Sequence, residues 1–273
     1  MAKKKKKEDM TFLEHLEELR WHLIRAVLAV TVFSIIAFIF DDFIFNKILL
    51  APKNPNFITN QVLCHLATVL NKPELCINTK PLPIINTMMS GQFQADMWIS
   101  FIAGIILAFP FIINEIWKFI SPALYVNERN QARGAVLAIS GLFLIGVLFG
   151  YYVIVPLSIH FLGTYSVSSQ IQNYINLNSY FSTIASATLA CGLVFELPIF
   201  AFFLAKIGVI SAAFMRKYRR HAIIIILIIA AIITPPDVFS QIMVTIPLIL
   251  LYEMSIFVVV IVQRKKLKNT SES

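Results

Sequence analysis

Three observations on this chain of 273 residues predict an all-α integral membrane protein with six transmembrane helices. Hydrophobic residues make up 58% of the sequence and charged residues 14%, whereas soluble domains carry about 25% charged residues. The apolar residues gather into six stretches, and lysine and arginine concentrate in every second segment between them. The basic run Lys3–Lys7 is followed by polar, helix-forming sequence, so we expect no cleavable signal peptide.

The six apolar stretches give the expected spans in chain order. They cover residues 24–42, 97–116, 134–158, 182–206, 222–236 and 240–262. The continuous apolar part of the fifth stretch, 222–234, has only 13 residues. Such a helix is about 20 Å long, against a hydrocarbon core of about 30 Å. We therefore predict short fifth and sixth spans, which either cross a thinned bilayer or form a re-entrant hairpin.

The distribution of Lys and Arg predicts that both termini face the cytoplasm (N-in/C-in). Nineteen of the 23 lie at the two ends of the chain and in segments 117–133 and 206–220, and four lie in segment 42–95. Cytoplasmic segments carry the excess of positive charge in multi-span proteins. Topology, with some affinity for anionic membrane lipid, therefore explains the net charge of +8 better than nucleic-acid binding does.

This topology divides the chain into three parts and places it in the cytoplasmic (inner) membrane. Residues 1–23 form a cytoplasmic tail and an amphipathic helix, and residues 24–262 form a single six-span membrane domain. The domain contains an extracytoplasmic loop at 42–95 and a cytoplasmic loop at 117–133. Residues 263–273 form a basic cytoplasmic tail.

The expected N-terminal helix carries acidic residues opposite its apolar stripe. Apolar side chains recur at helical spacing, at Phe12, Leu16, Leu19 and Leu23. On the other face Glu14 and Glu18 project together, and the local basic neighbour of Glu18 is His22, four residues on. These acids either receive a basic ligand at the membrane surface or form a solvated polar face. The pattern alone leaves both readings open.

Two of the three cysteines, Cys64 and Cys76, lie in the loop expected outside the cell membrane, where disulfides persist. Eleven residues separate them, so a bridge is sterically easy. We predict a disulfide that pins the loop, with two unpaired thiols as the alternative. Cys191 lies in the fourth span, where we expect it to pack as a small apolar residue.

The fourth span contains Glu196 near its centre, with Pro198 two residues later. A charged residue at the bilayer centre costs roughly 2.5–3.5 kcal/mol on insertion scales. Glu196 is therefore either part of a proton relay or a polar point in a water-lined concavity. Glu253 is a second carboxylate, in the sixth span. We expect Glu115, near a membrane end, to be structural, and either to snorkel to the interface or to pair with Lys118.

The corner before the last span reads as a capped turn. Pro235 and Pro236 end one helix, and Asp237 is well placed to cap the next. This structural explanation accounts for Asp237 but leaves Gln241 unexplained.

Motifs for catalysis and for metal binding are absent from the sequence. It contains no H-E-x-x-H, no G-x-S-x-G and no P-loop. The five histidines show no metal-ligand spacing. We therefore predict that the protein is not an enzyme and holds neither a cofactor nor a metal.

Five motifs occur in the order "FLEHLEELRWHL", "SPALYVNER", "FGYYVIVPL", "FELP" and "TPPDVFSQ". Together they resemble the TatC family, the polytopic receptor subunit of the twin-arginine protein translocase. The similarity runs from about residue 11 to residue 262, and the first and last motifs are the most specific.

The resemblance implies a cup-shaped bundle of six helices whose cytoplasmic face recognises twin-arginine signal peptides of folded precursor proteins. It also implies assembly with single-span TatA- and TatB-type subunits, a homo-oligomer within the translocase, and export driven by the proton-motive force without nucleotide.

The resemblance also implies roles for individual residues. By motif, Glu18 and Glu128 match the acidic residues that meet the arginine pair of the signal, and we expect Glu14 and Arg20 in the same site. Glu196 matches the intramembrane carboxylate on the concave face. The last motif supplies the expected partner contact, at Asp237 and Gln241.

Two departures and one rival function remain at this point. His22 stands where the family often has a second basic residue, and the long 42–95 loop receives no residue roles from the resemblance. The rival is a proton-coupled secondary transporter that uses Glu196 and Glu253. Six spans without an internal repeat argue against it.

Overall fold

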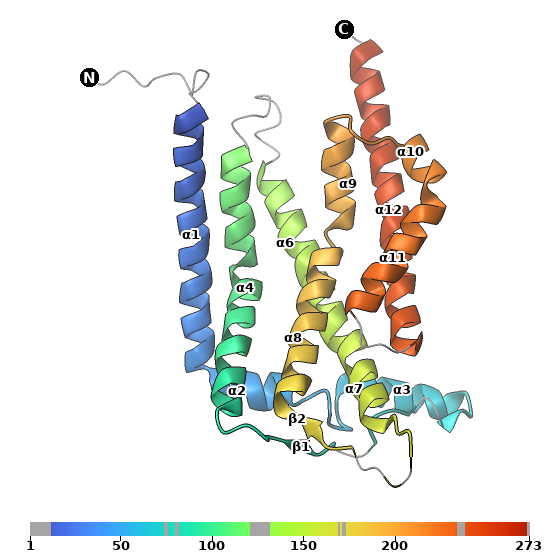
Figure 1. Ribbon diagram of the computed structural model, residues 1–273. Coiled ribbons are helices and arrows are strands. Elements are labelled where there is room, and N and C mark those ends of the chain that lie inside the picture. The colour runs from blue at the N-terminus through green and yellow to red at the C-terminus, as the bar shows by residue number, and fades with distance from the viewer. Residues whose placement is uncertain are drawn as a thin grey trace. The chain divides into compact units, whose positions relative to one another are not determined.

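The computed structural model describes residues 12–73, 76–79, 82–120, 132–168, 170, 173–233 and 238–271, and helices dominate them (Figure 1). The described residues fall into two compact units. The first comprises Met1–Asp41 and Asp96–Gly141, and the second comprises Asp42–Ala95 and Leu142–Ser273.

The first unit contains α1 (Phe12–Ile39), most of α4 (Gly91–Ile120) and the start of α6 (Ala132–Phe149). Helix α1 runs for 28 residues without a break. The expected amphipathic helix and the first span are therefore one continuous helix, which ends at Ile39 rather than at residue 42.

Helices α1 and α4 approach each other closely at Gly104. A β-carbon at this position would lie 2.8 Å from the backbone nitrogen of Ser34, so only glycine fits. Farther along the pair, the rings of Phe33 and Phe111 lie 5.4 Å apart. The close backbone approach and the ring contact fix the two helices side by side.

The second unit contains the end of α6 and most of the remaining elements. They are, in chain order, α2 (Asp41–Phe43), η1 (Ile44–Leu49), α3 (Ile58–Val69), β1 (Ile84–Ile85), η4 (Gly150–Ile154), α7 (Val155–Thr164), β2 (Ile175–Asn176), α8 (Leu177–Val194), α9 (Leu197–Lys206), α10 (Ala212–Lys217), α11 (Arg219–Ile233) and α12 (Val238–Ser271).

Small residues let the helices of the second unit pack closely. A β-carbon at Gly146 of α6 would lie 2.7 Å from the carbonyl oxygen of Cys191 on α8. One at Gly150 would lie 2.9 Å from the Cα atom of Thr188. Cys191 itself is buried as a free thiol, as the sequence predicts. Helices α9, α10 and α12 share a separate buried cluster of Ala201, Ala205, Ala212, Met215, Ile256 and Val259.

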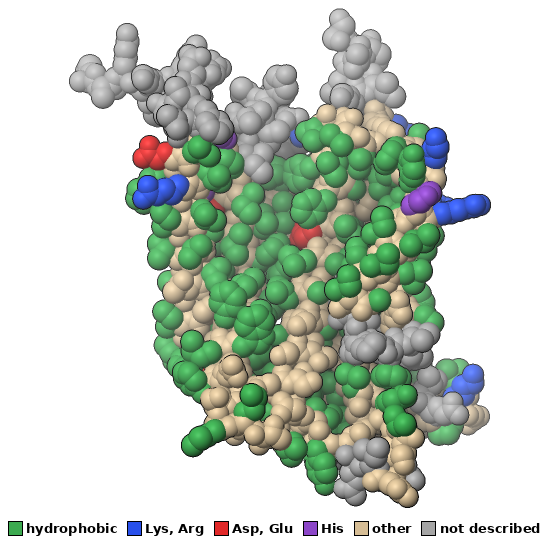
Figure 2. Space-filling model, in the orientation of Figure 1, with side chains coloured by type: hydrophobic (Ala, Val, Ile, Leu, Met, Phe, Trp, Pro, Cys, Tyr) green, Lys and Arg blue, Asp and Glu red, His purple; other side chains and the backbone are tan. Residues whose placement is uncertain are grey.

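Five helical stretches are long and apolar enough to cross a membrane. They are His15–Ile39, Gly91–Phe119, Gly134–Thr164, Leu177–Lys206 and Val244–Arg264. Each overlaps a span expected from the sequence. Hydrophobic side chains cover most of the face shown in Figure 2, as expected where helices meet lipid instead of water.

The last two expected spans differ from one another. Helix α11 has 15 residues and is shorter than the five membrane-length stretches. Helix α12 has 34 residues and contains Pro247, but its membrane-length part, Val244–Arg264, has 21 residues and is shorter than the other four stretches. A proline is tolerated in a membrane helix when its neighbours satisfy the freed backbone groups, and the lysine-rich sequence after Arg264 has good helix propensity.

The 42–95 loop has more structure than the sequence indicates. It contains η1 and α3, and β1 pairs in parallel with β2, with Ile84 opposite Ile175 and Ile85 opposite Asn176. These two-residue strands are the departure from an all-α fold in the described part of the chain. Figure 1 places α3, α7 and the strands at the same end of the second unit.

Candidate functional site

In the first unit, a group of basic side chains converges on Glu115 of α4. The Nδ1 atom of His22 on α1 lies 2.8 Å from Glu115 Oε2, and Arg25 Nη1 lies 3.6 Å from the same oxygen. Lys118 Nζ lies 2.5 Å from Glu115 Oε1, so the predicted Lys118 pair is confirmed. The sequence did not reveal the His22 contact, because the two residues lie 93 positions apart.

Aromatic contacts fix the same end of the helix pair. The ring of His15 stacks on Phe119 with centroids 4.5 Å apart. The ring of His22 meets the edge of Phe119 at 6.2 Å. Both histidines therefore hold α1 against α4 and present the adjoining turns of α1, which contain Glu18 and Arg20, in a fixed register.

The predicted signal-peptide residues are only partly visible in the structure. Glu18 lies on α1 and is half-buried, and Arg20 is exposed. Glu14 belongs to α1, but its side chain lies outside the described part of the structure, as does the whole of Glu128. Of the four residues, the structure therefore places the side chains of Glu18 and Arg20 alone.

Glu196 lies in the second unit, at a break between α8 and α9. Helix α8 ends at Val194, and α9 begins at Leu197 with Pro198 in its first turn. The Glu196 carbonyl accepts hydrogen bonds of 3.0 Å from the backbone N–H groups of Ile199 and Phe200. The break thus follows from the proline, which has no N–H of its own to donate.

The Glu196 side chain is almost completely buried. It is 4% exposed, and its Oε1 atom has no hydrogen-bond partner among the described residues. Buried carboxylates are normally paired or hydrogen-bonded because removing them from water is costly. Among the described residues this oxygen has no partner, so water or a polar group of another molecule would have to supply its hydrogen bond.

The far corner of the second unit ties α12 to α11. The Gln241 amide Nε2 donates a 3.3 Å hydrogen bond to the Leu227 carbonyl, which supplies a structural role that the sequence did not. Asp237 lies outside the described residues. Nearer the other end, Arg219 Nη2 lies 2.5 Å from Glu253 Oε2, so Glu253 is ion-paired across the same two helices.

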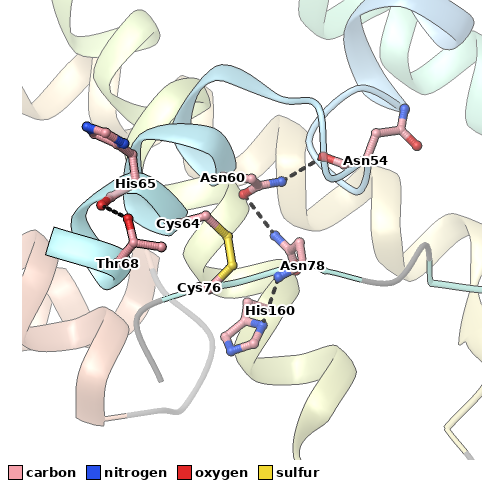
Figure 3. Close-up of a disulfide and its surroundings, with 8 residues drawn as sticks. All are labelled: Asn54, Asn60, Cys64, His65, Thr68, Cys76, Asn78 and His160. Atoms are coloured by element: carbon pink, nitrogen blue, oxygen red, sulfur yellow. Dashed lines mark hydrogen bonds between the residues drawn. A yellow bond between two sulfur atoms is a disulfide. The ribbon is translucent and has the colours of Figure 1, made fainter. Parts of the chain in front are cut away.

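The predicted pairing of Cys64 with Cys76 is present as a disulfide (Figure 3). It joins α3 to the segment that carries Asn78, whose side chain is buried. Asn78 Nδ2 donates to Asn60 Oδ1 at 3.2 Å and to the Pro156 carbonyl at 3.1 Å. This amide network holds the loop on α7.

Sequence reasoning missed the amide network. The residue type of Asn78 was the available cue, because asparagine adopts a positive φ more readily than most residues. In the structure Asn78 has a φ of 51°. Among the described residues, no cluster of three or more His, Cys, Asp or Glu side chains could hold a metal ion.

Comparisons with known proteins identify relatives over almost the whole chain. Residues 14–247 match the family described as Sec-independent protein translocase protein (TatC). A protein of that name from Blattabacterium sp. subsp. Periplaneta americana (strain BPLAN) is 43% identical over 265 residues, which cover 96% of this chain and 100% of that protein. The TatCy protein of Bacillus subtilis (strain 168) is 32% identical over 97% of this chain and 95% of its own.

Solved structures show the same fold. The crystal structure of the twin-arginine translocase receptor TatC in DDM matches with a TM-score of 0.71 at 33% identity, covering 89% of this chain and 98% of that chain. A second crystal structure of that receptor matches with a TM-score of 0.68 at 31% identity, covering 92% and 100% of the two chains.

Proposed function

The chain belongs to the TatC family of Sec-independent protein translocase proteins, and from that premise we propose that the α1 surface around Glu18, together with Glu128, binds twin-arginine signal peptides. As a twin-arginine translocase subunit of the cytoplasmic membrane, the protein is a transport component and not an enzyme. Because the chain belongs to this family, its function is that of a translocase subunit and not that of a proton-coupled secondary transporter.

The convergence of bases on Glu115 is the observation that carries the proposal. His22, Arg25 and Lys118 all lie within 3.6 Å of the Glu115 carboxylate. The Glu115 carboxylate therefore offsets one of the positive charges on the α4 side of the helix pair. An arginine that approaches Glu18 meets less repulsion than the sequence alone would indicate, because opposite charges in contact cancel at longer range.

Two arginines require two planar acceptors, which the pair Glu18 and Glu128 would supply. Guanidinium and carboxylate groups form two parallel hydrogen bonds, so the contact selects arginine over lysine by geometry. Half-burial of Glu18 strengthens such a pair relative to a fully solvated one. Glu14 and Arg20 would complete the polar surroundings of this site.

Site-specific photocrosslinking tests the assignment. With the photoreactive residue at position 21, an exposed site of α1, a precursor carrying its arginine pair should crosslink and a twin-lysine precursor should not. We expect Glu18→Ala and Glu128→Ala each to lower the arginine-dependent crosslink by roughly tenfold or more, since a charge-assisted hydrogen bond contributes about 1.5–3 kcal/mol.

Glu17→Ala is the matched control, because it removes an exposed carboxylate from the adjacent position of the same helix. It should leave the crosslink unchanged. Normal crosslinking and export in both the Glu18 and the Glu128 variants would overturn the site, whereas equal loss in the Glu17 variant would point to overall negative charge.

We also propose that the short helix α11 crosses the membrane, so that the protein has six spans and both termini in the cytoplasm. Four long helical stretches precede α11 and α12 is a fifth. Five crossings alone would leave the basic tail after Arg264 on the side opposite the N-terminus, against the positive-inside rule. A helix of 15 residues is about 22 Å long, so the bilayer would thin around it.

Cysteine labelling from the two sides of the membrane tests this topology. On a background with Cys191 replaced by Ser, a cysteine at position 238 should react with a membrane-impermeant maleimide added outside intact cells. A cysteine at position 271 should react only after the cells are opened. Labelling of position 271 in intact cells would contradict a sixth crossing.

Partner assembly is the remaining part of the proposal. The unpartnered oxygen of Glu196 favours contact with a partner helix or an inserted signal peptide, since both bring polar groups to the helix break. Asp237 and Gln241 would form a second contact for single-span TatA- or TatB-type subunits near α11 and α12. In this arrangement the proton-motive force drives export by a cup-shaped homo-oligomeric receptor without a nucleotide.

A further inference from the structure

A cationic and aromatic surface follows the fourth membrane-length stretch of the chain. It consists of Arg216, Lys217 and Arg220, together with Phe214 and Tyr218, and all five side chains are exposed. We name it the α10–α11 basic surface. In Figure 2, basic and histidine side chains gather at the edge where Figure 1 places α10 and the start of α11.

One sequence distance and one contact place this surface at the membrane boundary. The stretch Leu177–Lys206 ends six residues before α10. The backbone N–H of Ala212, the first residue of α10, donates a 3.3 Å hydrogen bond to Gln263 Oε1 on α12. Gln263 adjoins Arg264, where the last membrane-length stretch ends. Helix α10 therefore lies where two apolar helices leave the hydrocarbon, at the level of lipid headgroups.

Helix α10 is held firmly, so its exposed side has a defined direction. Ala212 and Met215 are 7% and 8% exposed and belong to the cluster shared with α9 and α12. The Tyr252 hydroxyl also donates a 2.9 Å hydrogen bond to the Met215 carbonyl. The buried side faces the protein, and the basic side chains project away from it.

The cations of this surface are not neutralised by the described part of the chain. Arg219, at the start of α11, pairs with Glu253 at 2.5 Å. Among the described residues, no carboxylate forms an ion pair with Arg216, Lys217 or Arg220. Three exposed positive charges therefore remain within five residues of sequence.

The aromatic residues indicate what kind of anion fits beside these cations. Phe214 is 52% exposed and Tyr218 is 40% exposed, with ring centroids 4.6 Å apart. Exposed aromatic rings at the membrane boundary lie among headgroups and upper acyl chains. A soluble anion would use the cations alone, whereas a phospholipid would use both the cations and the rings.

We propose that the α10–α11 basic surface binds the phosphate headgroup of an anionic phospholipid, with Phe214 and Tyr218 against its glycerol and upper acyl chains. Arginine can hold a phosphate through two parallel hydrogen bonds, and Arg216 and Arg220 supply two such groups. The assignment to the cytoplasmic leaflet rests on the proposed orientation of the chain, but binding in detergent does not.

Native mass spectrometry of the full chain tests the proposal. The detergent-purified protein is titrated with phosphatidylglycerol or phosphatidylcholine, and the bound fraction is measured. We expect preference for phosphatidylglycerol, and a loss on the order of 100-fold in its apparent affinity in the triple variant R216Q/K217Q/R220Q, because each surface cation contributes roughly fivefold.

The matched control is K265Q/K266Q/K268Q, which removes the same number of charges from the C-terminal tail and should retain the lipid. Equal phosphatidylglycerol binding by the triple variant and the wild type would overturn the proposal. So would displacement of the lipid by millimolar inorganic phosphate, which would indicate a soluble phosphate site.

A protein partner is the other occupant that the experiment can detect. If the triple variant kept the lipid but lost copurifying single-span subunits, an acidic segment of a partner would be the ligand, and the lipid proposal would be wrong. Glu18→Ala should leave lipid binding unchanged, so failure of the signal-peptide site and failure of this inference give different results.

Discussion

Glu115 lies on α4 and Glu196 at the break between α8 and α9, and the surroundings of these two carboxylates are opposite in kind. Glu115, with a side chain 12% exposed, has His22, Arg25 and Lys118 within 3.6 Å. Glu196 is 4% exposed, and its Oε1 atom has no hydrogen-bond partner among the described residues. The first carboxylate holds two helices together, whereas the second keeps one oxygen unpaired among the described residues.

The comparison separates stability from function. A partly buried carboxylate with its partners in place stabilises the fold mainly because removing it would leave those partners uncompensated. A buried carboxylate with one oxygen left unpaired costs stability and is retained for another reason. Substitutions at the two positions should therefore change the free energy of unfolding in opposite directions.

Glu115→Leu is expected to have the largest effect on stability. It leaves His22, which is 12% exposed, and two neighbouring cations without their shared acceptor. The free energy of unfolding should fall by about 2 kcal/mol, measured by denaturant titration in detergent. Glu115→Gln should recover part of this loss, because an amide oxygen still accepts a hydrogen bond from His22. If the Leu variant and the wild type had the same free energy of unfolding, the comparison between Glu115 and Glu196 would lose its basis.

Glu196→Leu should act in the other direction on stability and reduce assembly. Removing a buried carboxylate that keeps one oxygen unpaired is expected to raise the free energy of unfolding by about 1 kcal/mol. Copurification of TatA- and TatB-type subunits should fall, while Glu196→Gln should keep much of it, because an amide can still meet a polar partner. Equal loss of assembly in both variants would indicate a required charge or proton instead.

Hydropathy and charge predicted the membrane architecture because these properties depend on local composition. All five membrane-length stretches overlap expected spans. Boundaries were less predictable. Helix α12 continues to Ser271 because nothing in its polar end breaks a helix, and hydropathy marks where lipid ends, not where hydrogen bonding ends.

The polar contacts between residues far apart in the sequence could not be derived from the sequence. His22 meets Glu115 across 93 residues, and Asn78 meets Pro156 across 78. Such pairs depend on which helices become neighbours, a property that spacing along one helix does not encode. Glu196 was identified from sequence because a charge in an apolar stretch is itself anomalous. Glu128 and Asp237 stay predictions.

Glu253→Gln should have the smallest effect on the free energy of unfolding. It tests whether burial or pairing explains why substitutions at Glu115 and Glu196 change stability in opposite directions. Glu253 has a close partner, Arg219, but the two side chains are 39% and 49% exposed. Exposed pairs contribute roughly 0.2–1 kcal/mol, so the free energy of unfolding should fall by less than in Glu115→Gln. Salt screens exposed pairs, so the loss in free energy of unfolding caused by Glu253→Gln should be smaller at high than at low ionic strength. The loss caused by Glu115→Gln should be the same at both. A loss at Glu253 as large as that at Glu115 would mean that pairing alone, irrespective of burial, governs how these helices tolerate a carboxylate.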